Sequence, residues 1–214
     1  MISIKKLSRH TLSRMAVGLC TLAAAGTLAV SLGLTAASAA PATAALATSD
    51  GGSFTFPLVP SPGIHACLPH LSGSVTITPG SENDIMQVSI SGAPRNGEFD
   101  LFVIQQPLKP FGVSWYQTDV NADGHGNGQA TVRGIFNVET FSVSPGGTTT
   151  FSPTHQYHLG LWFNDPSVPF NLGCEHGATA PIVTPFNGQN DAGIQALNTS
   201  EFPDNAGPLS HVSS

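Results

Sequence analysis

The chain contains very few basic residues. Of its 214 residues, 7 are Lys or Arg and 13 are Asp or Glu. Four of the basic residues lie within the first 14 positions, so the rest of the chain holds only Arg95, Lys109 and Arg133 against all thirteen acids, a formal charge of −10. Such a chain cannot neutralise a row of phosphates. Nucleic acid and anionic membrane surfaces are therefore not expected as partners.

Long hydrophobic runs are also scarce. One uncharged apolar run, residues 15–34, follows the basic N-terminus and precedes a stretch of small residues, TAASAAPATA. This order is typical of a cleaved secretory signal peptide, here residues 1–40, with the cut between positions 39 and 44. An uncleaved anchor is the alternative, since a run of about 20 apolar residues can span a bilayer. The small residues favour cleavage, a secreted product and no membrane attachment afterwards.

Cysteine is limited to three residues, and Cys20 lies inside the predicted signal peptide. The other two, Cys67 and Cys174, would reach an oxidising compartment, where disulfides form and persist. A bridge between them would close a long loop and contribute on the order of 4 to 5 kcal/mol in the chain-entropy model. Two buried thiols or a metal pair are the alternatives. The sequence favours the disulfide.

No stretch after residue 40 has the 3.6-residue apolar period of a long helix. Short alternating runs instead predict strands, and the 23 glycines and 17 prolines of the chain suit many turns. This pattern predicts an antiparallel β-sandwich, or alternatively a β-barrel, at residues 54–200. Residues 41–53 are expected to form a flexible leader and residues 201–214 a polar surface tail. The expected strands are 74–78, 85–91, 98–106, 114–120, 129–137, 139–144, 157–164, 181–186 and 193–198.

The stretch TDVNADGHGNG resembles the first half of a calcium loop. Oxygen ligands would come from alternate positions, namely Asp119, Asn121, Asp123, His125 and Asn127. Ala130 stands where an EF-hand places a bidentate Glu, and no helix flanks the loop, so an EF-hand is excluded. Two interpretations remain, a calcium-binding hairpin tip and a plain turn. The turn is favoured, because Asn, Asp and Gly are ordinary turn residues.

Acidic and histidine residues suggest two weaker hypotheses. Glu98 and Asp100 share one face of a predicted strand and form a carboxylate pair of the kind used in glycoside hydrolysis. A Cys67–Cys174 bridge would gather His65, Glu175 and His176, a set that could bind zinc or copper. In both cases, exposed polar residues without catalytic or metal-binding roles are the favoured interpretation. No cofactor is expected to be required.

The aromatic residues offer a ligand platform. If the odd-numbered positions of residues 157–163 face the core, then His158 and Trp162 face outward, and an outward Trp could stack on a sugar ring. The other interpretation, which is favoured, buries both faces of this strand and places Trp162 in the interior.

Nucleophile and nucleotide-binding motifs are absent from the sequence, including G-x-S-x-G, H-E-x-x-H and the P-loop. No catalytic residue is therefore assigned. The sequence predicts a secreted, non-catalytic module that binds an extracellular or cell-surface ligand such as a polysaccharide. Two alternatives remain open, a secreted hydrolase that uses carboxylate and His residues and a purely structural envelope protein.

Overall fold

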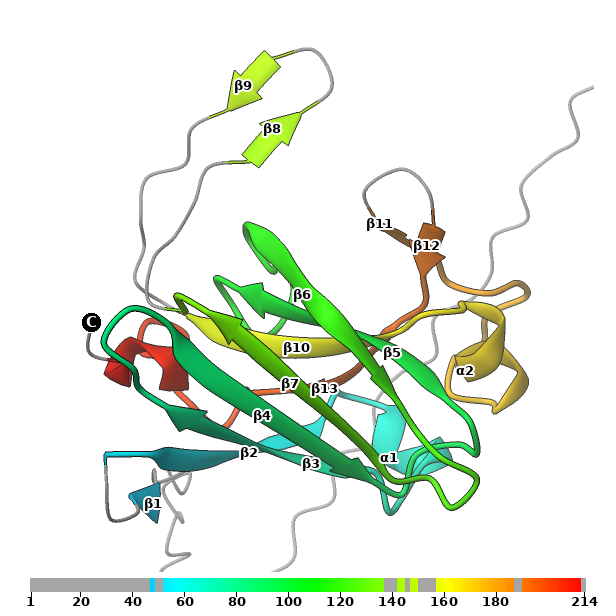
Figure 1. Cartoon of the computed structure of the whole chain (residues 1–214). Helices are drawn as coiled ribbons and strands as arrows, with labels where there is room; N and C mark the ends of the chain where they lie inside the picture. The colour runs from blue at the N-terminus through cyan, green and yellow to red at the C-terminus, as the bar shows by residue number, and fades with distance from the viewer. Residues whose placement is uncertain are drawn as a thin grey trace, which may run out of the picture. The chain divides into compact units, whose positions relative to one another are not determined.

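The structure, a computed structural model, describes residues 47–48, 52–136, 142–144, 147–149, 157–186 and 190–212 (Figure 1). The predicted signal peptide lies outside these residues. Within them, no helix has the length and apolar character needed to cross a membrane. The described part is built of strands with two short α-helices and a final 3₁₀ turn: β1 (Ala47–Thr48), β2 (Phe54–Pro60), α1 (Ile64–Cys67), β3 (Ser72–Thr78), β4 (Asp84–Ser91), β5 (Glu98–Ile104), β6 (Ser114–Asn121), β7 (Gly128–Gly134), β8 (Ser142–Ser144), β9 (Gly147–Thr149), β10 (His158–Phe163), α2 (Ser167–Asn171), β11 (Thr184–Phe186), β12 (Asn190–Ala192), β13 (Gln195–Asn198) and η1 (Pro208–His211).

Eight of these strands form one antiparallel path in the order β6-β5-β10-β13-β2-β3-β4-β7, with β1 added beside β2. The two ends of the path, β6 and β7, are consecutive in the chain and meet at a hairpin, where Ala122 bridges to Gly128. The sheet therefore curls almost to closure around one core (Figure 1). The all-β prediction is confirmed, and sandwich and barrel both describe this sheet.

The main core lies between the two halves of the curled sheet. Alternate residues point into it from each strand, as in β3, where Val75 and Ile77 are fully buried, and in β4, where Met86 and Val88 are. This alternation is the period-2 pattern that the sequence predicts. Such burial, at about 25 cal/mol per Å² of apolar surface, is the main force that holds the two halves together.

The chain outside the expected domain boundaries also joins the fold. β1 pairs with β2 through Ala47–Thr48, inside the expected leader. In the expected surface tail, Phe202, Leu209 and Val212 are buried in the main core. These apolar side chains are spaced too irregularly to predict a strand, yet each packs into the main core.

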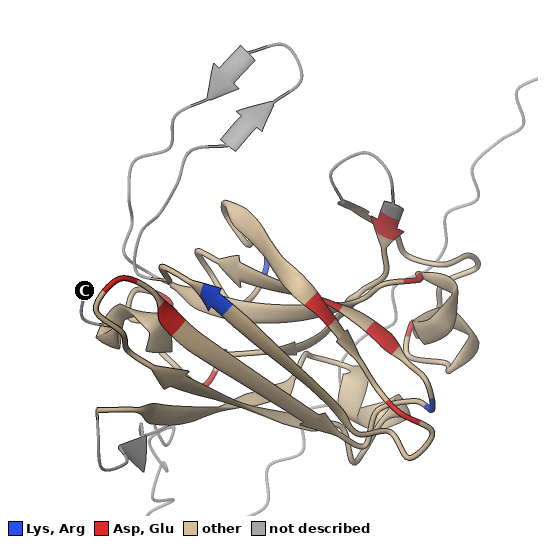
Figure 2. Cartoon of the chain, viewed as in Figure 1, with Lys and Arg blue, Asp and Glu red and all other residues tan. Residues whose placement is uncertain are grey.

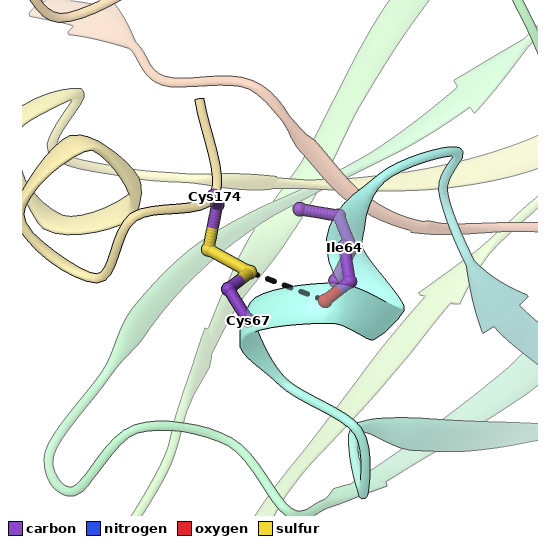
Figure 3. Close-up of a disulfide and its surroundings, with 3 residues drawn as sticks. All are labelled: Ile64, Cys67 and Cys174. Atoms are coloured by element: carbon purple, nitrogen blue, oxygen red, sulfur yellow. Dashed lines mark hydrogen bonds between the residues drawn. A yellow bond between two sulfur atoms is a disulfide. The ribbon is translucent and has the colours of Figure 1, made fainter. Parts of the chain in front are cut away.

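The predicted disulfide is present between Cys67 and Cys174, whose Cα atoms are 5.1 Å apart (Figure 3). It joins the end of α1 to the segment that follows α2, across a sequence separation of 107 residues. The Sγ of Cys67 also lies 3.1 Å from the carbonyl oxygen of Ile64. Because a disulfide sulfur has no hydrogen, this is a close contact and not a hydrogen bond. The bridge is compatible with an extracellular protein.

Candidate functional site

The sheet formed by β6, β5 and β10 has a second face, directed away from the main core. Because cross-strand partners share a face, the register places Phe102 beside Tyr116 and Asp100 beside Trp162 on this outer face. A bulge between Leu101 and Phe102 shifts the register of β6 and brings Tyr116 to the outer side. Aromatic and acidic side chains therefore lie next to each other here.

A small aromatic cluster covers part of this outer face. Phe102, Ile104, Trp162 and Ala192 are buried together, and Phe111 packs against them. The Trp162 ring meets Phe102 edge-on at 5.3 Å between centroids and Phe111 edge-on at 4.9 Å. Edge-to-face contacts of this kind stabilise aromatic pairs beyond their burial. They fix the orientation of the Trp162 ring.

Gly160 makes room for the Trp162 ring. A Cβ built at Gly160 would lie 2.7 Å from Cη2 of Trp162 and 2.8 Å from Nε2 of Gln195. Any larger residue at this position on β10 would force the indole to move. The glycine is therefore part of the structure of the site rather than a turn residue.

The segment 105–113 folds back over Trp162 and carries Phe111 to it. Backbone bonds from Gln105 N to Val113 O at 3.1 Å and from Gln106 N to Phe111 O at 3.0 Å close this loop. The side chain of Gln105 accepts from Val113 N at 3.0 Å, and Gly112 has a φ of 70°, where a side chain would strike Gln105. The Lys109–Pro110 bond in the loop is cis.

The first cavity, called here the aromatic cavity, has a volume of about 250 Å³. It is walled by Phe102, Phe111, Tyr116 and Trp162, with Thr184 of β11 at its edge. Tyr116 is 44% exposed, whereas Trp162 is only 4% exposed. The accessible aromatic surface is thus supplied by Tyr116, and Trp162 forms the interior wall.

His158 and Trp162, the residues of the weaker platform hypothesis, are both buried, as the favoured interpretation expects for Trp162. Both side chains leave the main core, as the alternation predicts, but neither is exposed. Trp162 is covered by the segment 105–113. His158 is fully buried, with its Nε2 3.3 Å from the carbonyl oxygen of Asp204 and its Nδ1 2.9 Å from Oγ1 of Thr199. Since a carbonyl only accepts, Nε2 carries the proton, and burial lowers the pKa of His158.

A second cavity of about 560 Å³ adjoins the first and shares Phe111, Trp162 and Thr184 with it. It is called here the Glu175 cavity. Glu175 is 7% exposed, and its Oε2 accepts the backbone N–H of Ile182 at 2.8 Å. Its Oε1 is buried and has no hydrogen-bond partner among the described residues.

Buried polar side chains form one wall of the Glu175 cavity. Oγ of Ser61 donates to Oε1 of Gln195 at 2.9 Å, and Nδ2 of Asn198 donates to the same Oε1 at 3.1 Å. Nε2 of Gln195 donates to the carbonyl of Pro107 at 3.1 Å. This network ties β13 to the start of the covering loop. It therefore holds the loop, and with it Phe111, over the sheet.

Asp100 of β5 lies directly opposite Asp119 of β6 in the ladder, so both carboxylates belong to the outer face. Figure 2 colours the acidic positions along the strands red. Asp100 is 1% exposed, and its Oδ1 accepts from Nδ2 of Asn164 at 3.0 Å. Its burial, together with the nearby charges of Asp119 and Glu98, raises the pKa of Asp100, although the bond from Asn164 acts in the opposite direction.

Tyr116 connects this pair to the aromatic cavity. Its hydroxyl donates to Oδ1 of Asp119 at 2.7 Å. Partial burial and this bond to Asp119 raise the pKa of Tyr116 to about 12. The phenol therefore stays protonated at neutral pH, and the bond holds the exposed ring at the mouth of the cavity.

The predicted calcium loop runs from the end of β6 into the hairpin turn. Oδ1 of Asp123 accepts the backbone N–H groups of His125 at 2.7 Å and of Asn127 at 3.0 Å, and these bonds lower the pKa of Asp123. This carboxylate oxygen thus organises the turn. Asn121 is the last residue of β6, next to the turn, whereas Asp119 lies two residues earlier on the strand and accepts the hydroxyl of Tyr116. Calcium binding at this tip stays a prediction.

Zinc or copper binding by His65, Glu175 and His176 stays a prediction, and Glu175 and His176 line the same cavity. Glu175 is buried in its cavity, whereas His65 on α1 and His176 are exposed. Across the part of the chain that the structure describes, no three His, Cys, Asp or Glu side chains form a group suited to a metal ion.

Comparison of the chain with models of known protein families gave no match, and no curated protein matched its sequence. The site must therefore be interpreted from its own residues. Trp162 and Glu175 were singled out from the sequence, each for a different role. Phe111 and Tyr116 were not, although a Pro-Phe-Gly turn beside an aromatic strand is a signal that could have indicated them.

Proposed function

We propose that the chain is a secreted, non-catalytic β module that binds an extracellular polysaccharide through the aromatic cavity. The main support is the exposed ring of Tyr116, which lines a preformed cavity whose walls include Trp162 and Phe111. Flat rings offer apolar contact to sugar faces. A mostly apolar hollow with a few fixed polar groups is the usual form of a binding site for a small ligand unit.

Support for a non-catalytic role comes from the acids. A catalytic carboxyl must reach the bond that it cleaves, but Asp100 is 1% exposed, and Asp119 already accepts the Tyr116 hydroxyl. Asp119 instead positions the ring of Tyr116. The hydrolase alternative would be favoured if a panel of glycosides and esters gave turnover that Glu98→Gln or Asp100→Asn abolished.

The proposed function is tested by pull-down of the secreted domain on insoluble polysaccharides. Tyr116→Ala should abolish retention, because it removes the accessible ring. Tyr116→Phe should retain binding, because it keeps the ring and loses only the bond to Asp119. Retention of the alanine variant at the wild-type level, or no retention of the wild type on any polysaccharide, would refute the proposal. The second result would leave the structural envelope role.

A further inference from the structure

The rings that line the aromatic cavity stand at steep angles to one another. Phe102 meets Tyr116 at an interplanar angle of 72° and Trp162 at 78°. Trp162 in turn meets Phe111 at 81°. Rings at such angles form the walls of a hollow rather than one flat platform. A sugar face can stack on the exposed ring of Tyr116, but the hollow itself suits a rounder group.

The hollow is also small. Its volume of about 250 Å³ is below the roughly 300 to 1,000 Å³ of pockets that take drug-sized ligands. It therefore has room for one substituent of a ligand and not for several sugar units.

Among the described residues that line this cavity, none carries a charge. Its polar side chains are the hydroxyl groups of Ser114, Tyr116 and Thr184. A carboxylate or sulfate on the ligand would find no cation in this lining, and a primary ammonium, with three N–H donors, would meet only hydroxyl oxygens among the side chains. A quaternary ammonium has no N–H to satisfy, and aromatic rings attract it through the negative charge over their faces. The lining therefore favours an N-methylated cation.

The charge around the cavity has the sign that a cation requires. Asp119 accepts the hydroxyl of Tyr116 at 2.7 Å, so a carboxylate lies beside one of the lining rings. Lys109 lines the Glu175 cavity and not this one. Outside the predicted signal peptide, three basic residues stand against thirteen acids. A domain of this charge attracts cationic ligands and repels anionic ones.

We propose that the aromatic cavity receives a quaternary ammonium group carried by the polysaccharide, while the adjoining sugar face stacks on Tyr116. This inference rests on the proposed function and deepens it, because it names the group that the cavity selects. A neutral sugar unit still stacks on Tyr116, but it binds more weakly because it lacks the attraction between the cation and the rings.

The test is an NMR titration of the whole secreted domain, followed at the indole N–H of Trp162, with two matched small probes. One is choline, and the other is its uncharged carbon isostere, in which a tert-butyl group replaces the trimethylammonium group. The two molecules have nearly the same shape. A merely apolar hollow would prefer the isostere, because an uncharged group is easier to remove from water. We expect choline to bind at least about threefold more tightly.

Variants of Tyr116 test the role of the ring. Tyr116 is 44% exposed, so Tyr116→Leu should fold normally. Leucine is apolar but has no negative ring face, and this variant should bind the two probes to within about twofold of each other. Tyr116→Phe keeps the ring and should keep the preference for choline.

Variants of the acids test the role of the nearby charge. In Asp119→Asn, the amide oxygen can still accept the hydroxyl of Tyr116, so this variant should weaken choline binding and leave binding of the isostere unchanged. Glu201→Gln removes the same charge from an exposed acid that lines neither cavity, and should bind both probes as wild type does.

Four results would decide between the claims. Wild-type binding of the isostere that equals or exceeds binding of choline would overturn this inference, and the proposed function would stand if neutral hexasaccharides still bound in a Tyr116-dependent manner. A preference for choline that persists in Tyr116→Leu would also overturn the inference, because charge alone would then explain it. A preference for choline without retention on any polysaccharide would overturn the proposed function and uphold the selectivity of the cavity. No binding of any probe or polysaccharide would overturn both.

Discussion

Asp100 and Asp119 face each other across the β5–β6 ladder, on the face of the sheet that carries the aromatic cavity. One of them is buried and the other holds the hydroxyl of Tyr116. Two adjacent carboxylates, one desolvated, cannot both ionise without cost. Ionisation of Asp100 would therefore act on Asp119, the residue whose carboxylate holds the exposed ring of Tyr116.

The first prediction concerns Asp100→Asn. Burial raises the pKa of Asp100 in the folded state, so the folded protein holds this proton more tightly than the unfolded chain does. Stability contributed by this group is then present in acid and is lost as the pH rises through the folded-state pKa. The asparagine stays neutral and can still accept from Asn164. We expect the variant to melt above wild type at neutral pH, with the difference vanishing below about pH 4.

Calorimetric melts over a pH series measure this difference. Glu82→Gln, an exposed acid in the turn between β3 and β4, is the charge-matched control and should show no such trend. A difference between Asp100→Asn and wild type that does not change with pH would contradict the account of a buried, hard-to-ionise Asp100.

The second prediction concerns Gly160→Ala. The added methyl would clash with the Trp162 ring and with Gln195, so the indole must shift. We expect a loss of about 1 to 3 kcal/mol in the free energy of unfolding, together with loss of ligand binding. Gly124→Ala is the control, because nothing lies within 4 Å of a Cβ at that turn position. Equal stability of the two variants in urea titrations would show that Trp162 is not packed against Gly160.

The third prediction concerns the disulfide. The double variant Cys67→Ser with Cys174→Ser should lower the free energy of unfolding by about 4 to 5 kcal/mol, because the bridge closes a loop of 107 residues. Urea denaturation of both proteins measures the difference, and a thiol assay on denatured wild type should find none free in the secreted domain. A loss below about 1 kcal/mol would refute the assigned role of the bridge.

The fourth prediction concerns the hairpin tip. Asp123 already accepts two backbone N–H groups, so we expect Asp123→Ala to lower the melting temperature equally in EDTA and in calcium. Asp123→Asn keeps the accepting oxygen and should melt close to wild type in both buffers. If calcium raised the wild-type melting temperature and neither variant responded, the tip would be an ion site rather than a plain turn.

Much of the fold could be predicted from the alternation of apolar residues. The apolar pattern predicted β4 and β5 to within two residues at each end. The burial of β4 repeats with period 2, whereas β5 is buried on both faces and corresponds to the continuous apolar run within 98–106. β2 was not among the expected strands, since Pro57 and Pro60 interrupt its pattern. The burial of Leu209 also could not be predicted, because it depends on packing against core residues that are distant in the sequence.

The candidate site was predictable only in fragments. The alternation of apolar residues correctly predicted that Trp162 points away from the main core. Its burial, however, involves Phe111, which is 51 positions earlier in the sequence and reaches Trp162 only through the folded loop. Glu175 drew attention as a neighbour of Cys174. Its unpartnered buried oxygen and its place in a cavity that Phe111 and Trp162 also line follow from the packing of segments that no local pattern relates.

The central claim is that sugar units bind beside Trp162, and the most direct test is the indole N–H signal in a ¹⁵N–¹H NMR titration with neutral hexasaccharides. The chain has two tryptophans, which give two indole signals to compare. Trp162 walls both cavities, whereas Trp115 packs against the main core. The account predicts a saturable shift of the Trp162 signal and a stationary Trp115 signal. A Trp162 signal that stays unmoved by every neutral hexasaccharide would contradict it.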